Sequence, residues 1–546
     1  MPEPMEQKRK IGYNSVAVGI FVLTAFVLYF LFSWVTPPML DDFMFLRDYM
    51  LHNDESQKLT LKGFLGFSQF MRATDNSRLM NLLWPVYGIA APKFVLSALI
   101  GGSMAFTLYL IAKLSAPGGK VSPFWFVFVW IATIIALPWR GNMITGVFAE
   151  NYMVSSAFNL LFIFLLCRKY GNGGNIHPLT AVCLVLLSAF TGALHEGFSA
   201  PVLVGIGVWF CIRRFKVPGV WWMMTVAYAL GLLWLLTSPS LWINLSISDT
   251  FVQAPPFNIK YALPLLLPTI LLVLSGATAA AIPKLRTEIR QMFADPAFII
   301  IMVSYIAEIT LMVRLGFKAN RMAWVLNIFA ITMLSYMFQR LTRSRIKHCK
   351  TGALKLAYRG GYIVILIFYI NVLHWQIHFK KQQEAIFSQL KQSAFGTIYY
   401  DFDPSCPKTT LLHPTHTTWW DRHNNNQFNR FAPEGKIYAV VPAALSDLSE
   451  PFDSLPAVEG NAGMCQYKGV LLHKDIDVKC LSTRKWDIEP IANEAPLNIV
   501  SADGEVFDSM DAMFLRFIAP TGERMIYVRP LHYKVKGPYS RVDFSN

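Results

Sequence analysis

The chain has 546 residues, of which 54% are apolar and only 15% are charged, and its formal net charge is +15. Soluble globular proteins are about one quarter charged, so this composition excludes an ordinary soluble protein. From Lys380 onward the chain has 18 Lys and Arg and 20 Asp and Glu, whereas the preceding part has 31 basic and 14 acidic residues. The positive charge therefore belongs to the apolar part, and no nucleic-acid partner is expected.

Long apolar runs separated by short basic loops fill residues 1–375 and predict an α-helical multi-pass membrane domain. A helix needs about 17–25 mainly apolar residues to cross a bilayer. The sequence predicts eleven such helices, at 13–35, 94–113, 122–138, 152–167, 178–194, 197–212, 219–237, 261–282, 296–312, 322–338 and 358–375. The first is too long for a signal peptide and has no small-residue cleavage site, so we expect a retained anchor.

Basic residues fall in alternate loops, which predicts the orientation of the chain. The loops expected in the cytoplasm include Lys113, Arg168 and the run from Arg340 to Lys355. The opposite loops carry most of the acidic residues. With the N-terminus in the cytoplasm, an odd number of helices places residues 376–546 outside.

The first outer segment, residues 36–93, is a long loop that begins with Asp41-Asp42. Adjacent carboxylates repel each other, and a cation, a metal ion or a substrate hydroxyl would offset that repulsion. A solvated acidic helix end is the alternative. The loop also contains aromatic-rich amphipathic stretches at 64–70 and 79–87, which suit helices lying in the membrane interface.

Three further positions place ionisable groups at the outer ends of predicted helices. Arg78 either extends along the membrane interface or binds a substrate phosphate. Glu150 opens the fourth predicted helix, where the helix dipole favours a carboxylate. His195-Glu196 occupies a tight turn, which requires neither a base nor an acid. That pair could bind a metal ion, transfer a proton or hydrogen-bond a sugar.

Arg314, Lys318 and Arg321 lie between the ninth and tenth predicted helices. Three cations on the outer side oppose the usual charge bias, and arginine forks suit phosphate groups. A solvated basic hairpin is the alternative. Glu308, one or two turns inside the ninth helix, could neutralise one of these cations.

Residues 376–546 read as a small, mixed and mostly β soluble domain outside the membrane. Apolar and β-branched runs at 396–401, 436–441, 469–479, 497–502 and 525–530 predict strands separated by turn residues. Cys406, Cys465 and Cys480 allow one disulfide and one free thiol in this domain, and the sequence does not choose the pair.

The order of these features resembles the GT-C class of membrane glycosyltransferases, in which an acidic pair and interfacial helices follow the first transmembrane helix. A soluble outer domain often ends such chains. The matching positions are Asp41-Asp42, Asn76-Ser77-Arg78, Asn151-Tyr152, His195-Glu196 and the late outer arginines. The chain is similar to bacterial members from surface-polysaccharide loci. Trp419-Trp420-Asp421 spells the signature of the oligosaccharyltransferases but lacks the tyrosine and glycine that follow it there.

The resemblance implies an inverting enzyme of the bacterial inner membrane that moves a sugar from a polyprenyl-phosphate donor to a glycan or lipid acceptor. It implies that Asp41 or Asp42 is the base. The phosphate contacts would come from Arg78, Arg314, Lys318 and Arg321, and further site candidates are Glu150, Tyr152, His195, Glu196 and Glu308. A divalent cation, Mg²⁺ or Mn²⁺, is left open, and its ligands would come from Asp41, Asp42, Glu150, His195 and Glu196.

Two other functions are compatible with the sequence. A transporter or flippase of lipid-linked sugars would show broken helices near the bilayer midplane and inverted repeats. An O-antigen-type polymerase or ligase would use a lipid-diphosphate donor and the outer arginines, but it would not need Asp41-Asp42.

Overall fold

The computed structural model describes residues 3–38, 41–74, 77–116, 119–139, 146–171, 176–242, 259–314, 323–342, 351–393, 396–401, 439–460, 463–475, 492–530 and 537–544. They form two compact units. The first unit comprises residues 1–36 and 48–373, and the second comprises residues 37–47 and 374–546.

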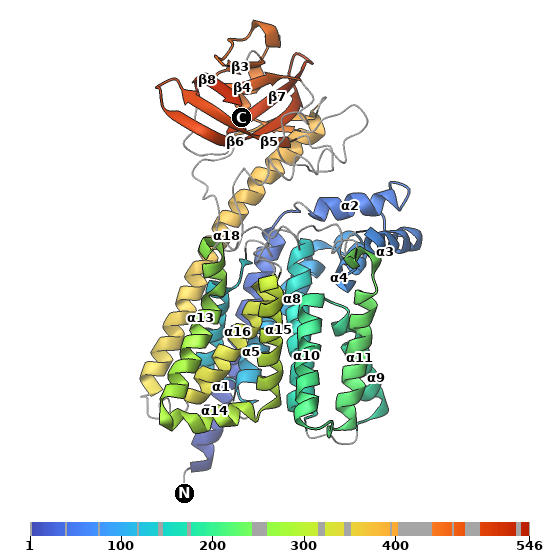
Figure 1. The fold of residues 1–546 in the computed structure, drawn as a ribbon, viewed down its shortest axis with the longest axis vertical. Helices are drawn as coiled ribbons and strands as arrows, with labels where there is room; N and C mark the ends of the chain where they lie inside the picture. Colours follow the sequence, from blue (N-terminus) through green and yellow to red (C-terminus); the bar gives the residue numbers. More distant parts are fainter. Residues whose placement is uncertain are drawn as a thin grey trace. The chain divides into compact units, whose positions relative to one another are not determined.

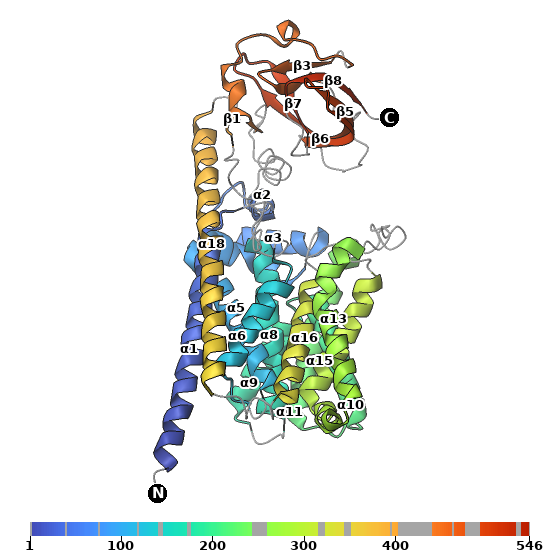
Figure 2. The same cartoon turned by 90° about the vertical axis from the view of Figure 1, so that its left-hand side faces the viewer.

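The first unit is a bundle of helices that run side by side, with shorter helices lying across their ends (Figures 1 and 2). The upright helices are α1 (Glu3–Val35), α5 (Lys93–Ser115), α6 (Pro123–Ala136), α8 (Gly146–Phe164), α9 (Pro178–Gly192), α10 (Glu196–Ile212), α11 (Gly219–Leu236), α13 (Ile259–Ala281), α15 (Pro296–Arg314) and α16 (Ala323–Leu341). α18 (Thr351–Gln392) begins in this unit and continues into the second. Short helical segments complete it: α3 (Leu61–Thr74), α4 (Leu79–Trp84), η1 (Pro85–Ala90), η3 (Leu165–Lys169), η5 (Pro283–Leu285) and α14 (Arg286–Phe293). α2 (Asp41–Leu51) spans the boundary between the units.

The expected fold, mostly apolar helices followed by a small sheet-containing region, is confirmed. Each of the eleven predicted segments coincides with a helix. Six of the described helical segments are long and apolar enough to cross a membrane: Ser15–Val35, Lys93–Ser115, Gly146–Lys169, Gly219–Leu236, Pro296–Val313 and Gly352–Gln389. Other apolar helices are shorter; the 14 residues of α6, for example, extend about 21 Å against a hydrocarbon core of about 30 Å. The count of eleven crossings therefore stays a prediction.

Glycine residues allow neighbouring helix backbones in the bundle to touch. A Cβ atom on Gly192 would collide with the carbonyl oxygen of Tyr228, and one on Gly231 would collide with that of Ala189, so α9 and α11 pack at backbone distance. A Cβ atom on Gly205 would lie only 2.5 Å from the carbonyl oxygen of Ile300, which brings α10 equally close to α15. Small residues are the usual basis of close helix packing within membranes.

Both predicted amphipathic stretches are helical. α3 lies across the ends of the upright helices in both ribbon views (Figures 1 and 2). It buries Gly63, Phe67 and Met71 and exposes Leu61 and Leu65. The second stretch forms α4 and the π-helical turn η1. An apolar exposed face on such a helix suits the membrane interface.

The second unit contains a six-stranded antiparallel sheet of order β3-β4-β7-β6-β5-β8. Its strands are β3 (Met464–Tyr467), β4 (Val470–Lys474), β5 (Ala492–Ser501), β6 (Val506–Ile518), β7 (Arg524–Pro530) and β8 (Tyr539–Phe544). A parallel pair, β1 (Thr397–Tyr399) and β2 (Ala439–Val441), forms a separate sheet that packs against it. Figures 1 and 2 show the strands of this sheet from two sides.

The central part of this sheet is buried on both faces. Successive residues of β6 alternate between two apolar clusters: Phe514 contributes to one, and Met513 and Leu515 contribute to the other. The five predicted strand segments all contain a strand, but β3, β6 and β8 were not predicted. A strand buried on both faces lacks the alternation of polar and apolar residues that marks a half-exposed strand.

Candidate functional site

The site is centred on an ion pair between Arg78 and Glu196, which lie 118 positions apart in the sequence. Arg78 Nε donates to Glu196 Oε2 at 2.9 Å, and Arg78 Nη2 donates to Glu196 Oε1. The contact is therefore bidentate, and the side chains are only 17% and 29% exposed. Burial by itself lowers the pKa of Arg78, but the Glu196 carboxylate raises it, and the net shift is upward. The guanidinium stays charged in this position.

Local structure holds the two partners in place. Arg78 immediately precedes α4, and the backbone amide of Leu79 donates to the carbonyl oxygen of Ala193 at 3.1 Å. That bond joins the start of α4 to the turn between α9 and α10. Glu196 is the first residue of α10, where the positive end of the helix dipole favours a carboxylate.

His195 caps the N-terminus of α10. Its backbone is extended, and its Nδ1 atom accepts a hydrogen bond from the amide of Gly197 at 3.1 Å. Because Nδ1 accepts, the proton of a neutral ring lies on Nε2. The side chain is buried, with 4% of the residue exposed. Helix capping thus gives His195 a structural role that the sequence did not suggest, and it also fixes the direction of Nε2.

Tyr152, on α8, packs between the ion pair and the imidazole. Its ring centroid lies 5.9 Å from Cζ of Arg78 and 5.0 Å from the centroid of His195. Trp324, on α16, lies behind it with a centroid distance of 6.5 Å. A cation over an aromatic face is attracted by the electrons of the ring, so Tyr152 helps to hold Arg78.

Glu308 reaches the same place from α15. It is 3% exposed, and its Oε1 atom lies 3.8 Å from the position that a Cβ atom on Gly197 would occupy. The His195 Cε1 atom lies 3.2 Å from that position. Within the part of the chain that the structure describes, Oε2 of Glu308 has no hydrogen-bond partner. Ionising a carboxyl group without a partner in an apolar bundle is costly, so such a group is usually retained for function.

Glu150 is also buried, but the structure corrects the explanation from the helix dipole. α8 begins at Gly146, so Glu150 is its fifth residue and lies beyond the first turn. The next residue, Asn151, donates from Nδ2 to Oδ1 of Asn81 and to the carbonyl oxygen of Val147, the latter at 2.8 Å. Asn81 was not predicted as a site residue. The only indication in the sequence is a side-chain amide within an otherwise apolar amphipathic stretch.

Other predicted site residues are not brought into this cluster by the described structure. The described residues do not include Lys318 and Arg321. They also leave out the side chains of Asp41 and Arg314. Asp42 is half-buried in α2 and belongs to the second unit.

The described side chains also bear on the proposed metal site. No three His, Cys, Asp or Glu residues among them are arranged to hold a metal ion. Both oxygens of Glu196 accept from Arg78, so a metal ion could use Glu196 only after that pair had opened.

The arrangement combines a fixed cation, a paired carboxylate, an oriented imidazole, an aromatic face and a second carboxyl group. These groups can hydrogen-bond hydroxyl groups and hold a proton at one end of the helix bundle. No protein-family model matches the chain, and neither the curated proteins nor the solved structures contain a match to it.

Proposed function

We propose that this chain is a membrane glycosyltransferase of the GT-C type. It would transfer a sugar from a polyprenyl-phosphate donor to an envelope glycan or lipid acceptor, on the outer face of a bacterial inner membrane. The order of sequence features supports this proposal, as does the buried polar cluster at one end of the apolar helices.

The observation that carries the proposal is the bidentate Arg78–Glu196 pair with Tyr152, His195 and Glu308 around it. A buried ion pair contributes little to stability when compared with apolar residues of similar size. Ionisable groups within a membrane bundle are therefore expected to serve function. Carboxyl, imidazole and aromatic groups together match a sugar, which presents both hydroxyl groups and an apolar face.

In this proposal the charge on the departing phosphate oxygen is stabilised by Arg314, Lys318 and Arg321. A carboxylate of Asp41-Asp42 accepts the proton of the attacking hydroxyl group. Arg78 acts mainly by fixing Glu196 and Tyr152. No step is assigned to a metal ion, because the paired state of Glu196 does not fit the expected ligand set.

The first experiment identifies the product. Surface glycans and glycolipids from a deletion strain would be compared with those of its parent by mass spectrometry. We expect one sugar substituent to disappear and to return with the wild-type gene, but not with Glu196→Gln. Unchanged glycans in the deletion strain would contradict the proposal.

The second experiment separates the enzyme from the alternatives. Asp41→Asn and Asp42→Asn would be assayed beside Arg314→Ala and Arg321→Ala, with purified protein in lipid nanodiscs. Loss of a general base lowers the rate about 10²–10⁴-fold. If transfer needs the arginines but not the acidic pair, a polymerase or ligase with a lipid-diphosphate donor is the better assignment. Lipid-linked sugar that crosses the bilayer without transfer would indicate a flippase.

A further inference from the structure

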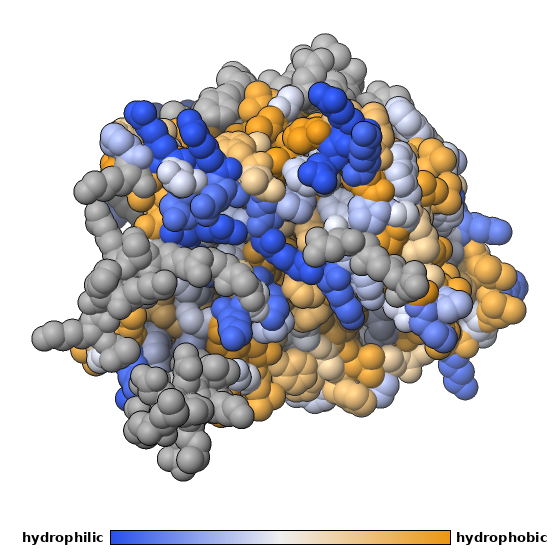
Figure 3. All heavy atoms as spheres, turned by 90° about the horizontal axis from the view of Figure 1, so that it is seen from below, coloured by the Kyte–Doolittle hydropathy of each residue, from blue (hydrophilic) through white to orange (hydrophobic). Residues whose placement is uncertain are grey.

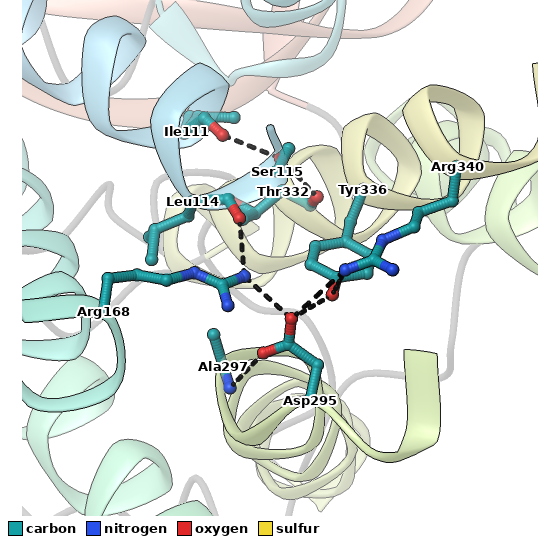
Figure 4. Close-up of polar contacts among 9 residues, drawn as sticks. All are labelled: Ile111, Leu114, Ser115, Arg168, Asp295, Ala297, Thr332, Tyr336 and Arg340. Atoms are coloured by element: carbon teal, nitrogen blue, oxygen red, sulfur yellow. Dashed lines mark hydrogen bonds and ion pairs between the residues drawn. The ribbon is translucent and has the colours of Figure 1, made fainter. Parts of the chain in front are cut away.

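A second polar cluster surrounds Asp295, the residue that precedes α15 (Figure 4). Arg168 Nη2 lies 2.9 Å from Asp295 Oδ2, and Arg340 Nη2 lies 3.5 Å from the same oxygen. The Tyr336 hydroxyl donates to it as well. The other oxygen, Oδ1, accepts from the amide of Ala297 at 3.0 Å. One carboxylate therefore pairs with two guanidinium groups and also caps the N-terminus of α15.

This cluster carries one more positive charge than negative charge. Arg168 also donates from Nη2 to the carbonyl oxygen of Leu114 at 3.0 Å, and Arg340 donates from Nη2 to the Tyr336 hydroxyl at 3.0 Å. Arg340 Nε is buried and has no hydrogen-bond partner among the described residues. The arginine side chains remain 27% and 18% exposed, so a ligand can reach them. Because two guanidinium groups share a single carboxylate, one positive charge is left for a second anion to neutralise.

The cluster lies at the opposite end of the first unit from Arg78. Tyr152 and Arg168 stand on one continuous helical segment, sixteen residues apart, which corresponds to about 24 Å along the axis. The face around the cluster is basic, and hydrophilic side chains gather on it (Figure 3). Further described basic residues at these helix ends include Lys113, Lys169, Arg213, Arg214, Arg286 and Arg290.

Apolar surface adjoins this charge. Phe293, two residues before Asp295, is 49% exposed, and Ile282 at the end of α13 is 38% exposed. Basic pockets between the ends of membrane-crossing helices suit the phosphate of an anionic headgroup, with its acyl chains along the helices. A soluble anion would gain nothing from the apolar neighbours.

We propose that Arg168 and Arg340 bind the phosphate of an anionic phospholipid headgroup, with Asp295 holding both arginines in position. The ligand's phosphate oxygens would complete the hydrogen bonding of the two guanidinium groups. This lipid site is separate from the site of the proposed sugar transfer, since it lies at the other end of the helices.

The test uses native mass spectrometry of the full chain in detergent, with phosphatidylglycerol or phosphatidylcholine added at equal concentration. Phosphatidylglycerol is expected to be retained at least about tenfold better. Arg340→Gln should reduce that retention about tenfold, the effect of one charge-assisted contact. Arg290→Gln removes the same charge from the same face outside the cluster and should leave retention unchanged. Asp295→Asn, which removes the carboxylate that holds both arginines in position, should also reduce retention.

Equal retention of the two lipids, or full retention in a folded Arg340→Gln variant, would overturn the proposal and leave the cluster as a purely structural clamp. If Arg340→Gln does not fold, Arg168→Lys replaces it, because lysine keeps the charge and loses the fork. Inorganic phosphate is added in a separate arm. Its displacement of phosphatidylglycerol from the wild-type chain would support the proposal, because it would show that the lipid is held through its phosphate.

Discussion

Glu308 and His195 lie next to the same glycine, with Glu308 Oε1 3.8 Å and His195 Cε1 3.2 Å from the place of a Cβ atom on Gly197. α15 and the first turn of α10 therefore meet through a carboxyl group and an imidazole. This meeting point yields the first prediction.

Glu308→Gln should lower sugar transfer while leaving the melting temperature unchanged or higher. Glutamine keeps the size of the side chain and removes an ionisable group whose Oε2 atom has no hydrogen-bond partner among the described residues, so folding should not suffer. Transfer and thermal unfolding in detergent are measured together. Glu288→Gln, the same change on α14 at the other end of the unit, serves as the control and should alter neither quantity. A Glu308→Gln variant with full transfer would remove Glu308 from the site.

The second prediction concerns the energy of the Arg78–Glu196 pair. Arg78→Met leaves the Glu196 carboxylate buried without its partner, and we expect a loss of about 1–3 kcal/mol after allowing for partial exposure. The double variant Arg78→Met, Glu196→Gln should regain part of this loss, because the unpaired charge is gone. Denaturant unfolding of the wild type, the two single variants Arg78→Met and Glu196→Gln, and the double variant gives the coupling energy. Additive effects would show that the two side chains do not interact in solution.

The third prediction concerns cysteine chemistry in the second unit. Cys465, on β3, is a free and buried thiol, and burial raises its pKa to about 12. It should resist maleimide at neutral pH until the unit unfolds. Any single disulfide in the second unit should then join Cys406 and Cys480, which lie outside the described residues. Peptide mapping without reductant tests this pairing, and a bridge that contains Cys465 would refute it.

The fourth prediction is a pH dependence set by His473 on β4. Burial lowers the pKa of His473 below its ordinary value of about 6.5, so the folded chain holds the neutral ring. The unfolded chain binds the proton more readily. The stabilisation is therefore complete above the unfolded pKa and is lost as the pH falls below about 6.5. Denaturant unfolding of the full chain, followed across this range, should show a lower midpoint for the second unit in acid, and His473→Gln should flatten the profile.

The fifth prediction is the orientation of the chain in the membrane. A reporter that is active only outside the cytoplasm should work when fused at position 400 and fail after Lys347. The charge of the loops is the basis of this expectation. The reverse pattern would place the second unit in the cytoplasm.

The positions of the helices could be predicted because apolar length and basic loops are local properties of the sequence. His195-Glu196 stood out for the same reason, since an acid and a base between two apolar segments are unusual. Their partners could not be predicted. Arg78 and Glu196 are 118 residues apart, and nothing in either segment indicates the other.

Two features were misread or missed for physical reasons. Glu150 was expected at a helix N-terminus, but the helix begins at Gly146, and an apolar run does not reveal its first turn. Asp295 was overlooked because a single acid among basic loops fits the charge bias of membrane proteins. Its two arginine partners come from separate helices, and only packing brings them together.

The helical segment from Gly146 to Lys169 links the two ends of the first unit mechanically. Tyr152 touches one polar cluster, and Arg168 belongs to the other. Because the segment is continuous, a shift of Arg168 along the helix axis would also shift Tyr152. The π-helical turn η3 is the point where such a displacement could be absorbed, because its wider winding interrupts the regular ladder of the helix.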